Sequence, residues 1–190
     1  MNQGMQPPGF PLLRETVLPG CFELQPFQQQ DARGRFVKTF HEPAFRALGL
    51  AVDWKEEFVS SSRKGVLRGM HFQTPPHDYV KLVTCLAGRA LDVSVDLRAR
   101  SPTFGQCAAL ELSAEKCNAV YLPSGLAHGF LALEEGTLVH YKVTCAHAPT
   151  HDGGILWSSI PFSWPEPDPI LSDRDRSFPS LHAFRSPFPR

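Results

Sequence analysis

The sequence lacks several features that mark specialised classes of protein. It carries no excess of charge, since 19 Lys and Arg balance 19 Asp and Glu, so no overall field would recruit nucleic acid or an anionic membrane. No apolar run approaches the roughly 18 residues that a membrane span needs, and residues 1–13 lack the basic and apolar regions of a secretory signal. We therefore expect a cytoplasmic protein with no nucleic-acid or membrane partner.

Cysteine pairs with the spacing of a zinc knuckle or a redox motif are also missing. The 5 cysteines are odd in number, and no two of them are separated by two residues. This usage favours a reducing compartment, because small secreted domains use cysteines in even, disulfide-bonded sets. We expect free, buried thiols.

Helical periodicity is scarce, whereas strand periodicity is plain. Residues 41–49 predict one short helix, with Pro43 in its first turn and Gly49 as its stop. Apolar and polar residues alternate with a period of two over 91–98 and 137–144. Turn-forming residues separate further apolar segments, which are 66–67, 81–86, 108–112, 119–122 and 129–133. This rhythm predicts an antiparallel sandwich or barrel in one domain over residues 1–190, with a core over about 20–180 and short extensions at both ends.

Proline is abundant and concentrated at one end of the chain. The sequence has 18 prolines in 190 residues, about twice the usual share of ~5%. Those of the last thirty residues are Pro161, Pro165, Pro167, Pro169, Pro179, Pro187 and Pro189. Because each proline removes a backbone donor and blocks helix continuation, we expect an extended connector over 164–169, no C-terminal helix, and disorder in the final ten or so residues.

Residues 122–130 carry the first motif with chemical content. The turn with Pro123, Gly125 and His128 resembles the second motif of the cupin superfamily of jelly-roll barrels, in which His128 would point into the barrel mouth. The first cupin motif supplies His-x-His and a Glu to a metal, but here Gln73 replaces the second His and Lys81 lies near the position of the acid. These residues cannot complete a metal site. We predict an all-β cupin jelly roll with few short helices, no metal and no other cofactor.

Seven motifs in order extend the resemblance over about residues 20–180. They are similar to motifs of the dTDP-4-dehydrorhamnose 3,5-epimerase family. The matching segments are 31–34, 66–73, 81–83, 92–105, 123–130, 141–144 and 171–175. The resemblance implies a homodimeric, metal-independent isomerase. Such an enzyme epimerises carbons next to the 4-keto group of a nucleotide-diphosphate deoxysugar, in deoxysugar and surface-polysaccharide (O-antigen, lipopolysaccharide) biosynthesis.

Four residues in these motifs match the chemistry of epimerisation. A proton beside a ketone leaves at a useful rate only when a base takes it while the enolate is stabilised, and inversion needs an acid on the opposite face of the ring. The resemblance implies that His71 is the base and that Asp175 orients its imidazole. It implies that Tyr141 is the opposite-face acid and that Lys81 stabilises the enolate oxygen.

Eight further residues are expected to bind the substrate. Arg68 and Arg33 are candidates for the diphosphate, because a guanidinium matches phosphate oxygens, and in the family the second of these crosses from the partner subunit. Several positions depart from the common family pattern: Lys38 reverses a charge, Glu56 and Phe58 replace Gln and Asn, and His147 replaces an aromatic that would stack on the base. The substrate-binding set is Arg33, Arg68, Gln73, His128, Lys38, Glu56, Phe58 and His147.

The sequence leaves three alternative functions open. The departures concern nucleotide and diphosphate positions, so the same chemistry on a CDP- or GDP-linked 4-keto sugar is one alternative. A non-catalytic cupin that binds a sugar nucleotide is the second, although a base and an acid argue against it. A metal-dependent cupin is the third, and it needs ligands that Gln73 and Lys81 do not provide. Whether C3, C5 or both are inverted is not encoded in these motifs.

Overall fold

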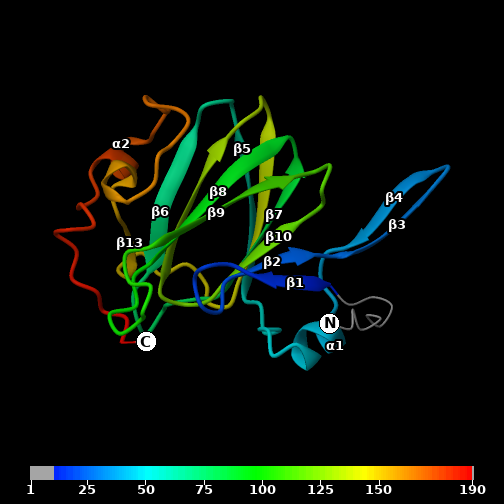
Figure 1. Cartoon of the computed structure of the whole chain (residues 1–190), viewed down its shortest axis with the longest axis horizontal. Coiled ribbons are helices and arrows are strands. Elements are labelled where there is room, and N and C mark those ends of the chain that lie inside the picture. Colours follow the sequence, from blue (N-terminus) through cyan, green and yellow to red (C-terminus); the bar gives the residue numbers. More distant parts are fainter. Residues whose placement is uncertain (1–10, 190) are drawn as a thin grey trace.

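Two antiparallel sheets facing each other form the body of the protein, as the computed structural model of residues 11–189 shows (Figure 1). The six-stranded sheet has the spatial order β1 (Leu12–Glu15), β2 (Phe22–Gln25), β10 (Ala119–Leu122), β7 (Lys81–Ala87), β12 (Thr137–Val143) and β5 (Glu56–Ser62). The five-stranded sheet has the order β13 (Asp152–Gly154), β6 (Leu67–Gln73), β11 (Leu126–Ala132), β8 (Arg89–Asp96) and β9 (Cys107–Ser113). This is the all-β jelly roll that the sequence predicts.

The remaining elements are few and short. A hairpin of β3 (Phe27–Asp31) and β4 (Gly34–Lys38) projects away from the two sheets (Figure 1). The helical elements are α1 (Glu42–Ala47), the 3₁₀ turn η1 (Trp157–Ser159) and α2 (Asp173–Arg176). The helix predicted over 41–49 is therefore confirmed as α1. The two alternating segments are confirmed as β8 and β12, and the shorter apolar segments fall in β6, β7, β9, β10 and β11.

The main core lies between the two sheets. Alternate side chains of β7 and β12 point inward, among them Val83, Cys85 and Val139, and they meet Phe130 of β11. Residues on the other face of the six-stranded sheet, including Leu82, form a separate cluster with Phe45 of α1. The six-stranded sheet thus buries apolar side chains on both faces.

The C-terminal segment covers the outer face of the five-stranded sheet. Val93 and Val95 point to that face and pack in one cluster with Phe188, which is 2% exposed. The backbone N–H of Ala99 donates to the carbonyl of Phe188 at 2.9 Å. The expectation of disorder in the final ten residues is therefore wrong for 181–189. An apolar outer sheet face has to be covered, and the phenylalanines of the tail supply the cover.

Two further expectations about the ends of the chain need correction. The described N-terminal residues are part of the barrel, because β1 pairs with β2 and Leu18 is completely buried. A one-turn helix, α2, also lies between Pro169 and Pro179, where no helix was expected. Its four residues fit in the gap between the prolines, and the Ser172 hydroxyl caps it by accepting the Asp175 N–H at 3.1 Å. Upstream of α2, residues 164–169 contain neither helix nor strand, as predicted.

The structure agrees in part with the predicted state of the cysteines. All five cysteines are free, as predicted, although only Cys21 and Cys85 are fully buried.

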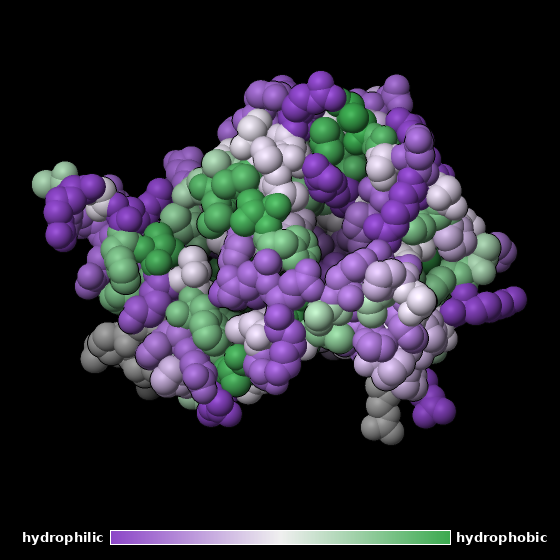
Figure 2. Space-filling model, turned by 180° about the vertical axis from the view of Figure 1, so that it is seen from behind, coloured by the Kyte–Doolittle hydropathy of each residue, from purple (hydrophilic) through white to green (hydrophobic). Residues whose placement is uncertain are grey.

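The surface seen from behind mixes hydrophilic and hydrophobic side chains, with hydrophobic patches beside a hollow (Figure 2). Within residues 11–189, no helix has the length and apolar character needed to cross a bilayer.

Candidate active site

One cavity of about 680 Å³ gathers most of the predicted site residues. It opens between β5, β6 and α2 and reaches inward to β7, β11 and β12. Eight of the twelve predicted residues line it: His71, Lys81, Tyr141, Asp175, Arg68, His128, Phe58 and His147. The predicted base, acid and cation therefore share one space, although they come from three different strands.

His71 of β6 is paired with Asp175 of α2. Its Nε2 lies 2.7 Å from Oδ1 of the carboxylate, and Asp175 is 4% exposed. Burial by itself would raise the pKa of Asp175, but the hydrogen bond and charge of His71, with the N–H of Gly69, hold this pKa below its ordinary value. A carboxylate there accepts the proton of Nε2, which leaves the lone pair of Nδ1 to act as a base. The edge of the Phe178 ring contacts the imidazole, with centroids 5.7 Å apart.

Two local features bring α2 and β6 together. Val66 forms a parallel bridge with Ile170, and the N–H of Leu67 donates to the Ile170 carbonyl at 3.0 Å, so the chain before α2 is fixed to the start of β6. Gly69 then lets β6 approach β11 closely, because a Cβ at this position would lie 2.6 Å from the Cα of Gly129. The contact of Gly69 with Gly129 therefore lies close to His71 on β6 and to His128 on β11.

Lys81 is a buried cation on the inner face of β7. The ammonium donates to the carbonyl of His71 at 3.2 Å and lies 5.0 Å from the centre of the Tyr79 ring. Burial lowers the pKa of Lys81 to about 8, and the carboxylates of Asp92 and Asp152 partly oppose this shift. With 6% exposure, its charge acts on the cavity with little screening by water.

Tyr141 lies on the inner face of β12 between two other rings. Phe58 stacks on it with centroids 4.7 Å apart, and the His128 ring meets it edge-on at 6.0 Å. Burial raises the pKa of the phenol, and the Asp92 carboxylate raises it further. Tyr141 is therefore a neutral phenol that can donate a proton.

A second histidine and carboxylate pair lies at the cavity, which His128 lines. His128 Nε2 lies 2.7 Å from Oδ2 of Asp92, and both side chains are almost completely buried. Burial lowers the pKa of His128, although Asp92 opposes the shift. The sequence reasoning missed Asp92. Its signal was the polar side of the alternating segment 91–98, whose Asp92, Ser94 and Asp96 are buried instead of facing solvent.

Four predicted residues do not line this cavity. Arg33 is at the tip of the projecting hairpin, 91% exposed and paired with Asp31 at 2.6 Å, and Lys38 ends the same hairpin. Gln73 and Glu56 line a smaller adjoining cavity of about 230 Å³. There the Gln73 amide bonds to three backbone groups, of His77, Ala146 and Ala148, while Glu56 accepts the His147 N–H at 2.7 Å.

The cavity also contains residues that the motifs did not single out. Arg174 of α2 pairs with Asp152 at 2.6 Å, and both line the cavity with Tyr79 and Arg63. Arg174 lies inside the matched segment 171–175, so the resemblance offered a signal for it. Asp152 lies far from any motif, and only the fold brings it here. Ser60 adds a hydroxyl beside the Tyr141 phenol, where its hydrogen bonding acts to lower the pKa of that phenol and partly opposes the effect of burial.

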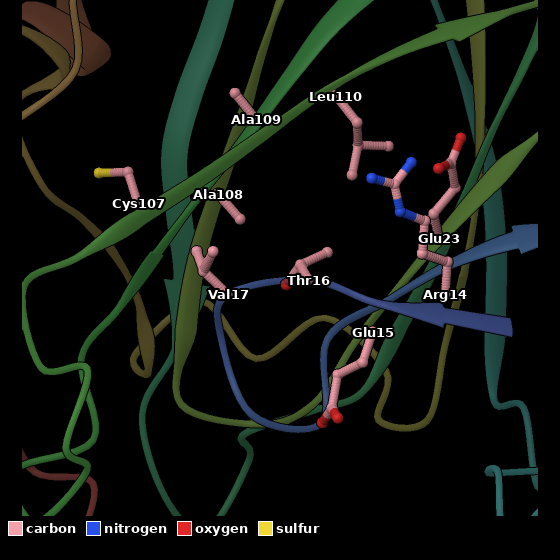
Figure 3. A pocket seen from close by; sticks show the side chains of 9 residues that line it. All are labelled: Arg14, Glu15, Thr16, Val17, Glu23, Cys107, Ala108, Ala109 and Leu110. Atoms are coloured by element: carbon pink, nitrogen blue, oxygen red, sulfur yellow. The ribbon is translucent and has the colours of Figure 1, made fainter.

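Another hollow, of about 460 Å³, lies between β1, β2 and β9 (Figure 3). Its lining residues are Arg14, Glu15, Thr16, Val17, Glu23, Cys107, Ala108, Ala109 and Leu110. None of these is a histidine or a tyrosine, so this hollow has no match to the acid and base groups found around His71. The described part of the chain also contains no cluster of three or more residues able to hold a metal ion.

Comparison with known proteins agrees with this geometry. The family model described as dTDP-4-dehydrorhamnose 3,5-epimerase matches residues 15–183. The chain belongs to the dTDP-4-dehydrorhamnose 3,5-epimerase family. A curated dTDP-4-dehydrorhamnose 3,5-epimerase of Shigella flexneri is 40% identical over 164 residues, which are 85% of this chain and 91% of the relative.

Solved structures of family members superimpose closely. The epimerase of Legionella pneumophila in complex with dTDP-4-keto-L-rhamnose is 32% identical with a TM-score of 0.90, covering 95% of this chain and 98% of its own. A 3'-monoepimerase of Streptomyces bikiniensis in complex with dTDP-quinovose is 33% identical with a TM-score of 0.83, covering 91% and 87%. The predicted family, jelly-roll fold and isomerase class are thereby confirmed.

Proposed function

We propose that this family member acts on a dTDP-linked 4-keto-6-deoxysugar and inverts C3 and C5, the two carbons beside the ketone. One observation carries the proposal: a histidine held by a buried carboxylate, a buried cation and a neutral phenol line the same cavity. These are the groups that removal and return of a proton beside a ketone require.

Each group has a separate part in the proposed reaction. Nδ1 of His71 takes the proton from the carbon, and the electron pair moves to the ketone to form an enolate. The ammonium of Lys81 stabilises the negative oxygen. The phenol of Tyr141 then gives its proton to the opposite face of the same carbon, which inverts it. The phenolate regains a proton from solvent, and His71 releases the one it took.

The dTDP-linked substrate is preferred to the CDP- and GDP-linked alternatives. A solved relative from Bacillus anthracis holds TDP, and the relatives from Legionella pneumophila and Streptomyces bikiniensis hold dTDP-linked sugars. Three arginines line the cavity and match a diphosphate: Arg63, Arg68 and Arg174. Two of them already have partners, since Arg68 donates to Ser62 and Arg174 to Asp152.

We also propose that the active form is a homodimer in which the β3–β4 hairpin reaches the cavity of the partner subunit. The hairpin is largely exposed, and Phe36 on it is 57% exposed. β1 and β9 are the edge strands of their sheets and flank the hollow of Figure 3, so backbone groups are available there for a second copy. This arrangement would bring Arg33 and Lys38 to a substrate. Residues 1–190 would form one domain in each subunit, in the cytoplasm.

Deuterium exchange tests the reaction directly. In deuterated water we expect wild-type enzyme to place one deuteron at C3 and one at C5 of the sugar, counted by NMR. His71→Ala should abolish exchange at both carbons, because His71 is the proposed base for each of them. Tyr141→Phe should retain exchange but lose inversion, because His71 can trade its proton for a solvent deuteron and return that to the face from which the proton left.

His140→Ala is the matched control, since His140 is on the same strand as Tyr141 but pairs with Glu57 outside the cavity. It should behave as wild type. Exchange at the wild-type rate in His71→Ala would refute the assigned base. A single deuteron would show that only one carbon exchanges and that at most one is inverted, as the name of the Streptomyces bikiniensis relative describes for that protein.

A further inference from the structure

Phe58 lies directly across from Tyr141 in the six-stranded sheet. The pairing of β5 with β12 places these two residues opposite each other, and both side chains line the cavity. Their rings are stacked, with centroids 4.7 Å apart and an interplanar angle of 15°. β5 is the edge strand of its sheet. Phe58 therefore covers Tyr141 on the open side, and the exposed fractions are 44% for Phe58 and 7% for Tyr141.

A histidine is the second aromatic neighbour of the Tyr141 ring. The His128 ring meets it at an angle of 71°, and the hydrogen bond to Asp92 holds that imidazole in place. Tyr141 thus contacts both a rigid neighbour and the ring of Phe58. Phe58 is 44% exposed, and among the described residues the stacked phenol is the one ring that it contacts.

We propose that Phe58 is a positioning residue for Tyr141. Its ring keeps the plane of the phenol fixed, so that the hydroxyl delivers its proton to one face of the sugar. The inference rests on the proposed function, in which Tyr141 is the acid. Without the stacked ring, the phenol turns away from that face more often. His71 then exchanges the proton it took for one from solvent and returns that to the enolate on the original face, so exchange occurs without inversion.

The test compares exchange with inversion in the same samples. Phe58→Ala should reduce kcat for inversion about two- to tenfold, the range that the loss of one aromatic pair predicts. Deuterium incorporation and KM should stay near wild type, so the ratio of exchange to inversion rises by the same factor. Phe58→Tyr keeps the stacked ring and should restore the wild-type ratio.

Val59→Ala is the control on the same strand. Val59 is the next residue of β5, points to the other face and is 51% exposed. It should leave the ratio unchanged. If Phe58→Ala fails to fold, Phe58→Leu replaces it, because leucine also lacks the ring. We expect the same rise in the ratio of exchange to inversion in that variant.

Three results would overturn the inference. A wild-type ratio of exchange to inversion in the variants that lack the ring would show that stacking does not orient the phenol. An increase in KM at unchanged kcat and ratio would make Phe58 a substrate contact instead. Wild-type protein that never exchanges deuterium would refute the proposed function itself, and that result is distinct from the other two.

Discussion

At the scale of single residues, burial gives the cavity its chemistry. Lys81 and Asp175 are both almost fully buried, yet the pKa of each is lowered, for different reasons. For Lys81 burial itself disfavours the charge, whereas for Asp175 the hydrogen bond from His71 outweighs burial. The cavity therefore combines a cation that is easily neutralised with a carboxylate that stays ionised.

The first prediction at this scale concerns pH. Because the pKa of Lys81 is lowered to about 8, its stabilising charge is present below that pH and lost above it. We expect kcat to fall as pH rises through about 8, measured between pH 6 and 10. Lys81→Arg should remove this alkaline fall, since an arginine stays protonated throughout that range. An identical alkaline fall in Lys81→Arg would assign the titration to another group.

The second prediction concerns the partner of the base. Asp175→Asn preserves size but removes the charge that holds the Nε2–H tautomer of His71. We expect kcat to fall about 10²-fold, the lower part of the range for general base catalysis, with little change in KM. Asp173→Asn is the control, because Asp173 is exposed in the same turn of α2. Equal losses in both variants would show that the fold of α2, not the carboxylate, is responsible.

At the scale of elements, the contact of β6 with β11 positions the two cavity histidines. His71 and His128 are register partners across these strands, and the pairing shifts between His128 and Phe130. Gly69 and Gly129 meet at this irregularity, with Gly69 at a φ of +153°. A side chain at either position would separate the strands and move the histidines.

Gly69→Ala tests the close approach. The added Cβ would lie 2.6 Å from the Cα of Gly129, and backbone cannot move aside cheaply, so we expect a loss of about 2 kcal/mol in the free energy of unfolding. Gly136→Ala is the control, since Gly136 also has a positive φ but has no atom within 4 Å of its added Cβ. It should cost about 1 kcal/mol from backbone strain alone. Urea denaturation measures both, and equal losses would contradict the packing argument.

The C-terminal segment is a further example at this scale. Phe184 and Phe188 both contact the ring of Phe72, with centroids 5.3 and 5.7 Å apart. Phe72 follows His71 in β6 and points to the opposite face. The tail therefore supports the outer side of the strand whose inner side carries the proposed base, His71.

At the scale of the whole molecule, Arg33 and Lys38 lie on the projecting hairpin and do not line the cavity of their own chain. The ion pair of Arg33 with Asp31 is exposed, and such pairs contribute little, so it does not prevent Arg33 from engaging a partner subunit.

Mixed dimers test this arrangement. We expect Arg33→Ala and His71→Ala each to be impaired alone, but heterodimers of the two to contain one intact site, with His71 from one subunit and Arg33 from the other. Random assembly in a one-to-one coexpression should give about a quarter of wild-type activity. Activity no higher than that of the separate variants would show that Arg33 does not act across an interface.

The sequence by itself determined the sheet architecture, the free thiols and the family. Period-two alternation over 91–98 and 137–144 is a local property, and short motifs around His71 and His128 keep their spacing regardless of distant parts of the chain. The motifs identified eight residues that line the cavity, without showing how they meet. The prediction of disorder in the last ten residues failed because it rested on the proline count. It did not consider the apolar sheet face that Phe188 covers.

Only the tertiary structure decided which distant side chains meet. The pairing of His71 with Asp175 spans 104 positions and depends on the bridge from Val66 to Ile170. Likewise, the stacking of Phe58 on Tyr141 depends on the register of β5 and β12. Such contacts arise from the free energy of packing two sheets together, which no local pattern records, and they convert separate motifs into one chemical site.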